Sequence, residues 1–459
     1  MGNESRGPES RGRTASTAGS GEPSGELPTT GRSSRLVAAV TEAPFVRNVA
    51  LLSSAAALSQ LIVVLAIPVV TRLYTPDDLG VLTLFLSIVL IAAPLATLRY
   101  SVAIPIADTD ELADDVLRLC FLITTGLALA MLPVLFGLQQ FTSLFNSAKV
   151  AGFTWLIPLV FVFSGFYQAL AQWAVRSRDF KLIATTRVTR SFAMVATQLG
   201  LGFLGVAPLG LLLGQLANHG SGAPRILTRV LNSRSQFFGS FRLDKVRFAA
   251  HRFRRFPLIQ TWSQLLLVVA GQLPAIFIAS RYGLIQAGLY GFAERMVNLP
   301  MALLGESVGQ VYYSEVASLW RTAPDKIRAI TRGVMTKLAS VAVIPTAIIL
   351  LAGPTMFRIV FGASWTDAGR FAQILAVLGM ARLITVPVVN CLNVLELQAW
   401  QFGANLVRVA IAVCAFLLAV GFGLSVTDFL LIFSAASVLF HLGFATTLLR
   451  YLRAPSELR

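Results

Sequence analysis

The residues of this sequence best suited to bind a ligand or an ion are the charged side chains inside apolar stretches. Arg382 lies in the middle of an apolar stretch from 370 to 392, and Arg408 lies in the middle of another from 400 to 422. Asn405 precedes Arg408 by three residues, so a helix would place both side chains on one face. Because a planar guanidinium can bind two oxygens of a phosphate group at once, these residues predict an anion-binding site. The alternative is a structural ion pair with a glutamate of the same bundle.

A third stretch, from 287 to 312, contains charges of both signs. Glu294, Arg295 and Glu306 fall, with two neighbouring amides, within about half of the circumference of a helix. We expect this face to line a cavity, with Arg295 as a further ligand for the anion. Glu294 and Glu306 are candidates for binding a proton or a sodium ion, because burial and nearby arginines move the pKa of a carboxylate in opposite directions. Fixed ion pairs with the arginines are the alternative.

The composition shows which elements must position these side chains. Apolar residues make up 55% of the 459 residues and charged residues 13%, with a mean hydropathy of +0.71. A soluble protein of this size could not accommodate such a composition, so the sequence predicts an all-α, polytopic membrane protein. Since one span takes roughly 20 residues, we expect about 12 transmembrane helices, at 48–70, 80–98, 116–138, 152–174, 182–203, 206–224, 257–280, 287–312, 334–352, 370–392, 400–422 and 428–449.

The net charge of +16 is distributed as in a membrane protein rather than in a nucleic-acid-binding protein. Most of the Lys and Arg fall in segments on one side of the predicted spans. Because basic loops stay in the cytoplasm, we expect a plasma (inner) membrane protein with both termini cytoplasmic. The segment 225–255 has nine Lys or Arg against one Asp, and we expect it to contact anionic lipid headgroups.

The same pattern divides the chain into five parts. We predict a disordered cytoplasmic tail at 1–45, because its Gly, Ser, Pro and Thr cannot bury enough apolar surface to order it. A six-helix bundle at 46–226, a basic cytoplasmic linker at 227–255, a second six-helix bundle at 256–450 and a short cytoplasmic tail at 451–459 follow. Three cysteines and three histidines lie apart from one another, so we expect neither a metal site nor a cofactor.

An internal repeat opens the two predicted bundles. The stretch Gln60 to Phe85 returns as Gln272 to Ala293, each with an arginine at the end of a helix and a glycine opening the next. A duplication explains two similar halves better than chance does. Gln60 and Gln272 are candidates for contacting a sugar, although a single glutamine in a span more often bonds a neighbouring helix.

Several of these stretches together resemble the lipid-linked oligosaccharide flippases of bacterial polysaccharide biosynthesis, within the multidrug/oligosaccharidyl-lipid/polysaccharide exporter superfamily. The stretches that carry the resemblance are TRLYTPDDLGVLTLF, LRYSVAIP, QALAQWAVRSRDF, RRFPLIQTWSQLL and AGLYGFAERMVNLPMALLGESVGQVYY. The resemblance implies two six-helix bundles around a central cavity that opens alternately to either side. It also implies export of an isoprenoid-diphosphate-linked oligosaccharide, with a polysaccharide polymerase and glycosyltransferases as partners.

Two other functions are open. One is a drug or cation antiporter of the same superfamily, which a markedly acidic cavity would favour. The other is an enzyme, a polytopic glycosyltransferase or polymerase, with Asp77 and Asp78 as a metal-binding pair. Against the enzyme, the repeat has Ile285 and Gln286 near that position, and no outer loop is long enough for a catalytic domain.

Overall fold

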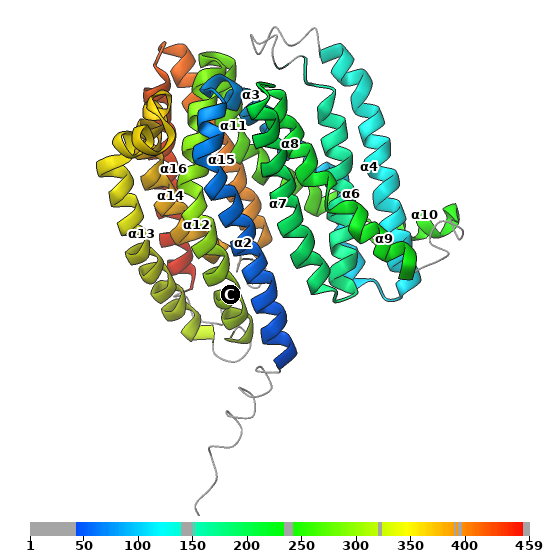
Figure 1. Ribbon diagram of the computed structural model, residues 1–459. Helices are drawn as coiled ribbons and strands as arrows, with labels where there is room; N and C mark the ends of the chain where they lie inside the picture. Colours follow the sequence, from blue (N-terminus) through cyan, green and yellow to red (C-terminus); the bar gives the residue numbers. More distant parts are fainter. Residues whose placement is uncertain are drawn as a thin grey trace, which may run out of the picture. The chain divides into compact units, whose positions relative to one another are not determined.

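The regular structure of this protein is helical throughout the part that the structure describes (Figure 1). The computed structural model describes residues 43–138, 150, 152–233, 242–319, 324–389, 392 and 397–452. The predicted all-α fold class is therefore confirmed. Nearly all of the predicted tails, 1–45 and 451–459, lies outside the described residues, as do 234–241 of the predicted linker.

In the described ranges the first half of the chain contains five helices of 21 to 31 residues and several shorter ones. Its elements are α2 (Ala43–Leu73), α3 (Pro76–Ala96), η1 (Tyr100–Ile106), α4 (Asp110–Leu138), α6 (Leu156–Arg176), α7 (Phe180–Phe203), α8 (Leu209–Gly220), α9 (Ala223–Ser233) and α10 (Leu243–Arg252). The turn between α2 and α3 shows how the sequence specifies a boundary. Thr75 caps α3 in a capping box with Asp78, and Pro76 begins the helix, where its missing N–H costs nothing.

Within the described residues the second half contains six α-helices of 22 to 38 residues. Its elements are η3 (Phe256–Gln260), α11 (Thr261–Tyr282), α12 (Leu284–Leu319), α13 (Pro324–Phe361), η4 (Ala363–Trp365), α14 (Thr366–Val389), α15 (Gln398–Gly421) and α16 (Val426–Tyr451). α16 begins with a second capping box, formed by Ser425 and Asp428.

Nine helices in the described ranges are long and apolar enough to cross a membrane, and each matches one of the twelve predicted spans. The chain is therefore a multi-pass membrane protein. The other three predicted spans also correspond to helices, α7, α8 and α12. α7 and α12 carry charges within their length, and α8 has 12 residues, about 18 Å, which is short against a hydrocarbon core of about 30 Å.

The two copies of the repeat pack against each other, α3 on both α11 and α12. The contact is reciprocal: a Cβ on Gly80 would overlap the carbonyl oxygen of Leu284, and a Cβ on Gly288 would overlap that of Pro76. Gly80 and Gly288 lie 208 residues apart, and so do Pro76 and Leu284. Since each residue of one copy meets the other residue's counterpart, the crossing has local two-fold symmetry. The duplication predicted from the sequence thus includes the contact between the copies.

The glutamines with which the repeat was predicted to begin do not occupy equivalent positions. Gln60 lies fourteen residues before Tyr74, whereas Gln272 lies ten residues before Tyr282. The two differ by four residues, so they point to similar sides of α2 and α11 but at depths about 6 Å apart.

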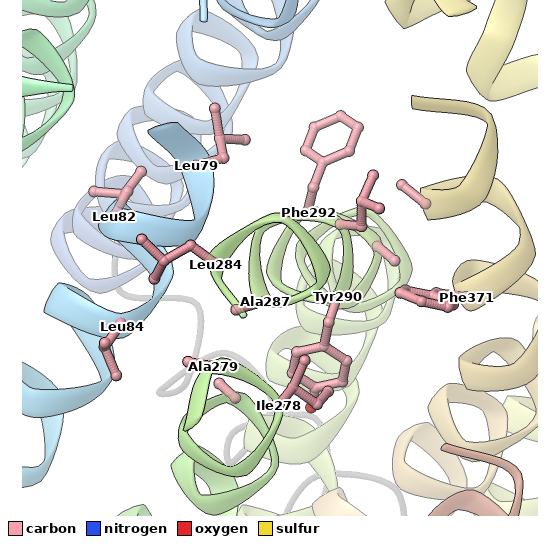
Figure 2. Close-up of a cluster of buried hydrophobic side chains, with 14 of the residues drawn as sticks. Leu79, Leu82, Leu84, Ile278, Ala279, Leu284, Ala287, Tyr290, Phe292 and Phe371 are labelled. Atoms are coloured by element: carbon pink, nitrogen blue, oxygen red, sulfur yellow. The ribbon is translucent and has the colours of Figure 1, made fainter. Parts of the chain in front are cut away.

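Apolar side chains from both halves fill the crossing in one continuous cluster. Figure 2 shows its centre, where leucines of α3 meet Leu284, Ala287 and Phe292 of α12, with Phe371 of α14 beyond. Trp365, fully buried, adds a bond between the halves, because its Nε1–H donates to the carbonyl of Thr71 at 2.9 Å. The halves are therefore closed against each other at the α2–α3 turn.

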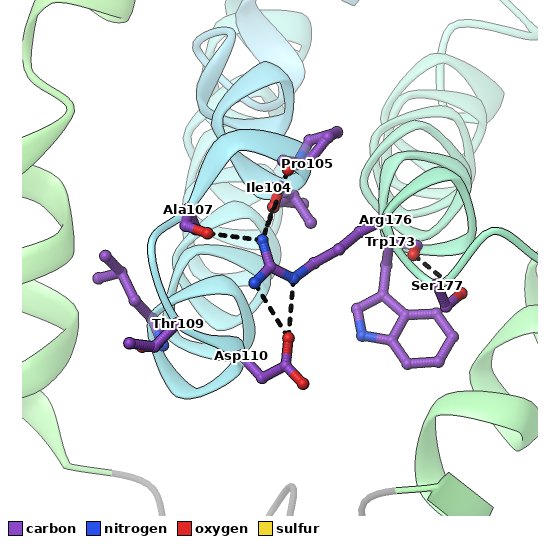
Figure 3. Close-up of polar contacts among 9 residues, drawn as sticks. Ile104, Pro105, Ala107, Thr109, Asp110, Trp173, Arg176 and Ser177 are labelled. Atoms are coloured by element: carbon purple, nitrogen blue, oxygen red, sulfur yellow. Dashed lines mark hydrogen bonds and ion pairs between the residues drawn. The ribbon is translucent and has the colours of Figure 1, made fainter. Parts of the chain in front are cut away.

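Arg176, the last residue of α6, connects three elements of the first half (Figure 3). Its Nη1 donates to the carbonyls of Ile104 at 3.1 Å and Ala107 at 2.7 Å, and its Nε donates to Asp110 at 3.0 Å. One guanidinium thus joins the end of α6 to η1 and to the start of α4. The stretches LRYSVAIP and QALAQWAVRSRDF, which carry part of the resemblance, meet at this point.

Candidate functional site

A cavity of about 200 Å³ lies between four helices of the second half. Its walls come from α11, α14, α15 and α16, and they are Leu267, Ala270, Gly271, Arg382, Arg408, Phe433, Ser437, Phe440 and His441. The structure therefore brings together the two arginines that the sequence placed in separate spans. α11 contributes apolar residues and a glycine, α14 and α15 contribute the arginines, and α16 contributes both aromatic and polar residues.

Arg382 forms an ion pair on the side of α12. Its Nη1 lies 3.3 Å from Oε1 of Glu294, and the two side chains are 26% and 24% exposed. Tyr290, one turn earlier on the same helix, is fully buried. The predicted alternative of an Arg382–Glu294 pair is thus present in this conformation.

Arg408 contacts a histidine instead of a carboxylate. Its Nη2 lies 3.3 Å from Nε2 of His441, whose Nδ1 lies 2.7 Å from the hydroxyl oxygen of Thr385. That hydroxyl donates its own proton to the carbonyl of Ala381 at 2.8 Å. Arginine only donates, so Nε2 must accept and Nδ1 must carry the proton. His441 is therefore neutral in this arrangement, with one tautomer selected by its neighbours.

The position of Arg382 depends on how α14 packs on α13. Pro354 has no N–H with which to bond the carbonyl of Leu350, four residues earlier. The side-chain amide of Gln373 donates to that carbonyl instead, at 2.6 Å. Gly353 and Gly369 bring the two backbones close, since a Cβ on Gly369 would lie 2.7 Å from the oxygen of Gly353. α14 is thereby held two to three turns from Arg382.

The charges of this cluster sum to a positive value. Arg382 and Arg408 contribute two positive charges, Glu294 contributes one negative charge, and the neutral His441 contributes none. A cavity with one excess positive charge and two guanidinium forks suits an oxyanion better than a cation. Phe440, with the guanidinium carbon of Arg408 5.8 Å from its ring centre, covers part of that arginine from solvent.

Four other predicted site residues, Arg295, Gln60, Gln272 and Asn405, are not among the residues that line this cavity. Arg295 is exposed on α12, and Gln60 and Gln272 are half-buried. Asn405 is buried one turn before Arg408, and its Nδ2 has no hydrogen-bond partner among the described residues. The side chain of Glu306 lies outside the described residues. Whether these five contact a substrate or an ion stays a prediction.

Sequence reasoning missed two polar residues of the cluster, His441 and Thr385. His441 was treated as isolated because no other metal ligand lies near it in the sequence. A better signal was its place in the middle of an apolar span, where an ionisable group is a candidate functional residue by default. In the described residues, no three His, Cys, Asp or Glu side chains gather closely enough to hold a metal ion.

Known proteins of similar fold are membrane transporters. A multidrug resistance MATE family transporter of the MOP superfamily, in an inward-facing conformation, superposes with a TM-score of 0.66 at 15% identity, covering 86% of this chain and 96% of that one. The lipid II flippase MurJ, in an inward closed conformation, gives 0.60 at 14% identity, covering 86% and 87%. A MOP superfamily transporter from Pyrococcus furiosus, described as having a binding pocket of reversed polarity, gives 0.53 at 15%, covering 89% and 96%.

These identities establish the fold alone. No curated protein sequence matches this chain. A family match is found, and it spans residues 69–370, well over half of the chain, with most of the first copy of the repeat and all of the second, although it ends before Arg382. It confirms the resemblance drawn from the sequence: the chain belongs to the family described as polysaccharide biosynthesis protein.

Proposed function

We propose that this protein is a flippase that moves an isoprenoid-diphosphate-linked oligosaccharide from the cytoplasmic to the outer leaflet by alternating access, for the synthesis of a cell-surface polysaccharide. The observation that carries the proposal is the cavity in which Arg382 and Arg408 converge from two helices with one excess positive charge. The family match and the fold shared with the lipid II flippase support it. The chain acts on a lipid without breaking its bonds, so it is a transporter rather than an enzyme.

The arginines would hold the diphosphate of the substrate. Two guanidinium groups on α14 and α15 can share the oxygens of two linked phosphates, each through paired hydrogen bonds. Arg408 contacts His441 through Nη2 alone, so the guanidinium gives up one hydrogen bond when it turns to an anion. In this reading the sugar occupies space outside the small cavity, because about 200 Å³ holds a diphosphate but not an oligosaccharide.

A drug or cation antiporter is the second candidate, since the MATE transporters share the fold. The charge of the cavity argues against it. A cationic drug entering beside Arg382 and Arg408 would meet repulsion that the single carboxylate of Glu294, already paired, does not offset.

The test is translocation in reconstituted vesicles. A lipid-linked oligosaccharide loaded in one leaflet is followed by its accessibility to an impermeant lectin, for the wild type and for Arg408→Ala, Arg408→Lys and Arg382→Ala. We expect loss of flipping by at least about 30-fold in the alanine variants, from about two or more kcal/mol of lost binding, and partial recovery with lysine. Arg370→Ala is the matched control, because Arg370 lies on α14 too but pairs with Asp367 at the surface. Equal flipping in wild type and Arg408→Ala would contradict the diphosphate role.

The direction of transport depends on the topology. We propose that α10 lies on the cytoplasmic side and the α11–α12 turn on the outer side. Single cysteines at Lys245 and Ile285, both exposed, should react with an impermeant thiol reagent from opposite sides of the membrane. Labelling of both from one side would overturn the orientation.

A further inference from the structure

We propose that His441 is the proton-binding site of the transport cycle, and that it takes up a proton when an anion binds Arg382 and Arg408. This inference rests on the proposed function, because it needs an anion in the same cavity. It assigns the coupling ion to a residue of α16, whereas the sequence pointed to Glu294 and Glu306.

Without an anion the geometry excludes a second proton on His441. Nδ1 already carries one, which it donates to Thr385 at 2.7 Å. A second proton could go only to Nε2, which faces Nη2 of Arg408 at 3.3 Å. It would turn an acceptor into a donor facing another donor, and it would place two positive charges side by side in a buried setting. His441 is 3% exposed, so water screens little of that repulsion.

A bound anion reverses this preference. As the guanidinium of Arg408 turns to the phosphate oxygens, Nε2 loses the donor that it faced. A proton from water can then bind Nε2, and the new N–H can donate to the same anion, which also offsets its charge. By linkage, an anion that favours protonation of His441 must itself bind more tightly when His441 is protonated. The proton and the anion therefore enter, and leave, together.

The other charged groups near His441 support this assignment. Arg408 on α15 and Arg382 on α14 both oppose protonation until an anion neutralises them. Glu294 on α12 is already paired with Arg382, at 3.3 Å. The wall residues from α11 and the rest of α16 are uncharged. His441 is thus the titratable group of this cavity whose partner an anion would draw away.

The test is calorimetry of inorganic pyrophosphate binding to the purified full-length chain near pH 6.5, in two buffers of different ionisation enthalpy. The difference in heat gives the number of protons taken up. We expect the wild type to take up more protons than His441→Gln, by up to one. As the pH falls from 7.5 to 5.5, the ratio of the pyrophosphate affinity of the wild type to that of His441→Gln should also rise. For one linked proton the rise is at most about tenfold per pH unit. Comparison with the variant removes the protonation of pyrophosphate itself.

His251→Gln is the matched control, because His251 is exposed on α10 and should leave both quantities at the wild-type values. Thr385→Val gives a second measurement if His441→Gln does not fold. This substitution removes the hydroxyl that accepts the Nδ1–H bond of His441. Because that hydroxyl also stabilises the protonated imidazole, proton uptake should move to lower pH.

Each outcome decides one of the two proposals. Equal proton uptake in the wild type and His441→Gln overturns the role of His441 and leaves the diphosphate site standing. If only Thr385→Val folds, uptake unchanged by that substitution does the same. Absence of pyrophosphate binding to the wild type contradicts the proposed function itself.

Discussion

Arg190 in the first half and Arg408 in the second occupy the same position in their helices but have different surroundings. α7 and α15 both have 24 residues, and the arginine is the eleventh residue of each. Arg190 donates from Nε to the carbonyl of Asn218 at 2.6 Å, and its guanidinium carbon lies 3.8 Å from the centre of the Tyr167 ring. Arg408 lines a cavity, and the hydrogen bond of its side chain within the described ranges goes to a neutral histidine.

The same place within a helix therefore does not decide what a guanidinium does, because its role depends on the neighbours that tertiary packing supplies. Arg190 bonds the last turn of α8, where a positive charge suits the exposed carbonyls. Gly222 leaves the room for this, since a Cβ there would lie 2.7 Å from the Tyr167 ring. The first half uses its arginine to hold helices together, whereas the second half leaves the equivalent arginine available for a ligand.

The largest effect should come from breaking the contact that the two halves share. A methyl group at Gly80 or Gly288 would overlap a backbone carbonyl, which cannot rotate away. Gly80→Ala and Gly288→Ala should each destabilise this closed arrangement by roughly 3 kcal/mol, with similar losses because the contact is reciprocal. Membrane abundance and thermal stability in detergent measure this. Gly126→Ala is the control, because a Cβ there meets nothing within 4 Å; a loss as large in that variant would show that the crossing is not special.

The next prediction separates the two arginines by what their removal costs. Arg190→Ala loses a charge-assisted hydrogen bond and a ring contact, and should lower the free energy of unfolding by about 2 kcal/mol. Arg408→Ala should leave stability within about 1 kcal/mol, because its histidine keeps Thr385 as a partner. Melting temperature and pyrophosphate affinity are measured on both variants. If Arg190→Ala loses pyrophosphate affinity but keeps its stability, or Arg408→Ala loses stability but keeps its affinity, the roles have been assigned to the wrong halves.

Glu294→Gln tests how much of the ion pair is structural. Both partners are about a quarter exposed, so losing the charge should cost roughly 1 kcal/mol or less of stability. It should also raise the positive charge of the cavity by one and tighten pyrophosphate binding several-fold, because Arg382 becomes free to turn to the anion. Calorimetry measures the stability and the pyrophosphate affinity of Glu294→Gln, with Arg370→Ala as the control. If Glu294→Gln weakens pyrophosphate binding, the pair serves to orient Arg382 and the free-arginine account is wrong.

The smallest expected effects are those of substituting Tyr74 and Tyr282, which lie at equivalent positions in the two copies of the repeat. The hydroxyl of Tyr74 donates to the carbonyl of Gln198 at 2.7 Å, and that of Tyr282 donates to the carbonyl of Leu424 at 3.1 Å. Burial, together with the charge of Asp78, raises the pKa of Tyr74 to about 12, so the hydroxyl keeps its proton throughout the physiological range. Tyr74→Phe should cost about 1 kcal/mol and Tyr282→Phe less, because Tyr282 is only half-buried. Thermal melts of the two variants measure this, and equal losses would show that burial does not set the difference.

Much of the fold could be predicted because its causes are local in the sequence. Runs of apolar residues determine where helices cross the membrane, and Thr75 with Asp78 or Ser425 with Asp428 determines where helices begin. Three predicted spans are not among the nine helices that are long and apolar enough to cross a membrane. Two of them, α7 and α12, carry charges, and the third, α8, is short. The repeat was visible because Gly80 and Gly288 follow similar helix ends, but the misaligned glutamines show that spacing alone does not establish equivalence.

The helical membrane fold, the duplication and the presence of arginines inside spans could all be read from the sequence alone. Hydropathy, helix length and the cost of a buried charge all act along the chain, so a linear reading contains them. Only the tertiary structure decided that Arg382 faces Glu294, that Arg408 faces His441, and that Arg190 holds α8 instead of lining a cavity. These pairings join residues 28 to 88 positions apart through the packing of separate helices, and no local pattern in the sequence encodes which helix faces lie together.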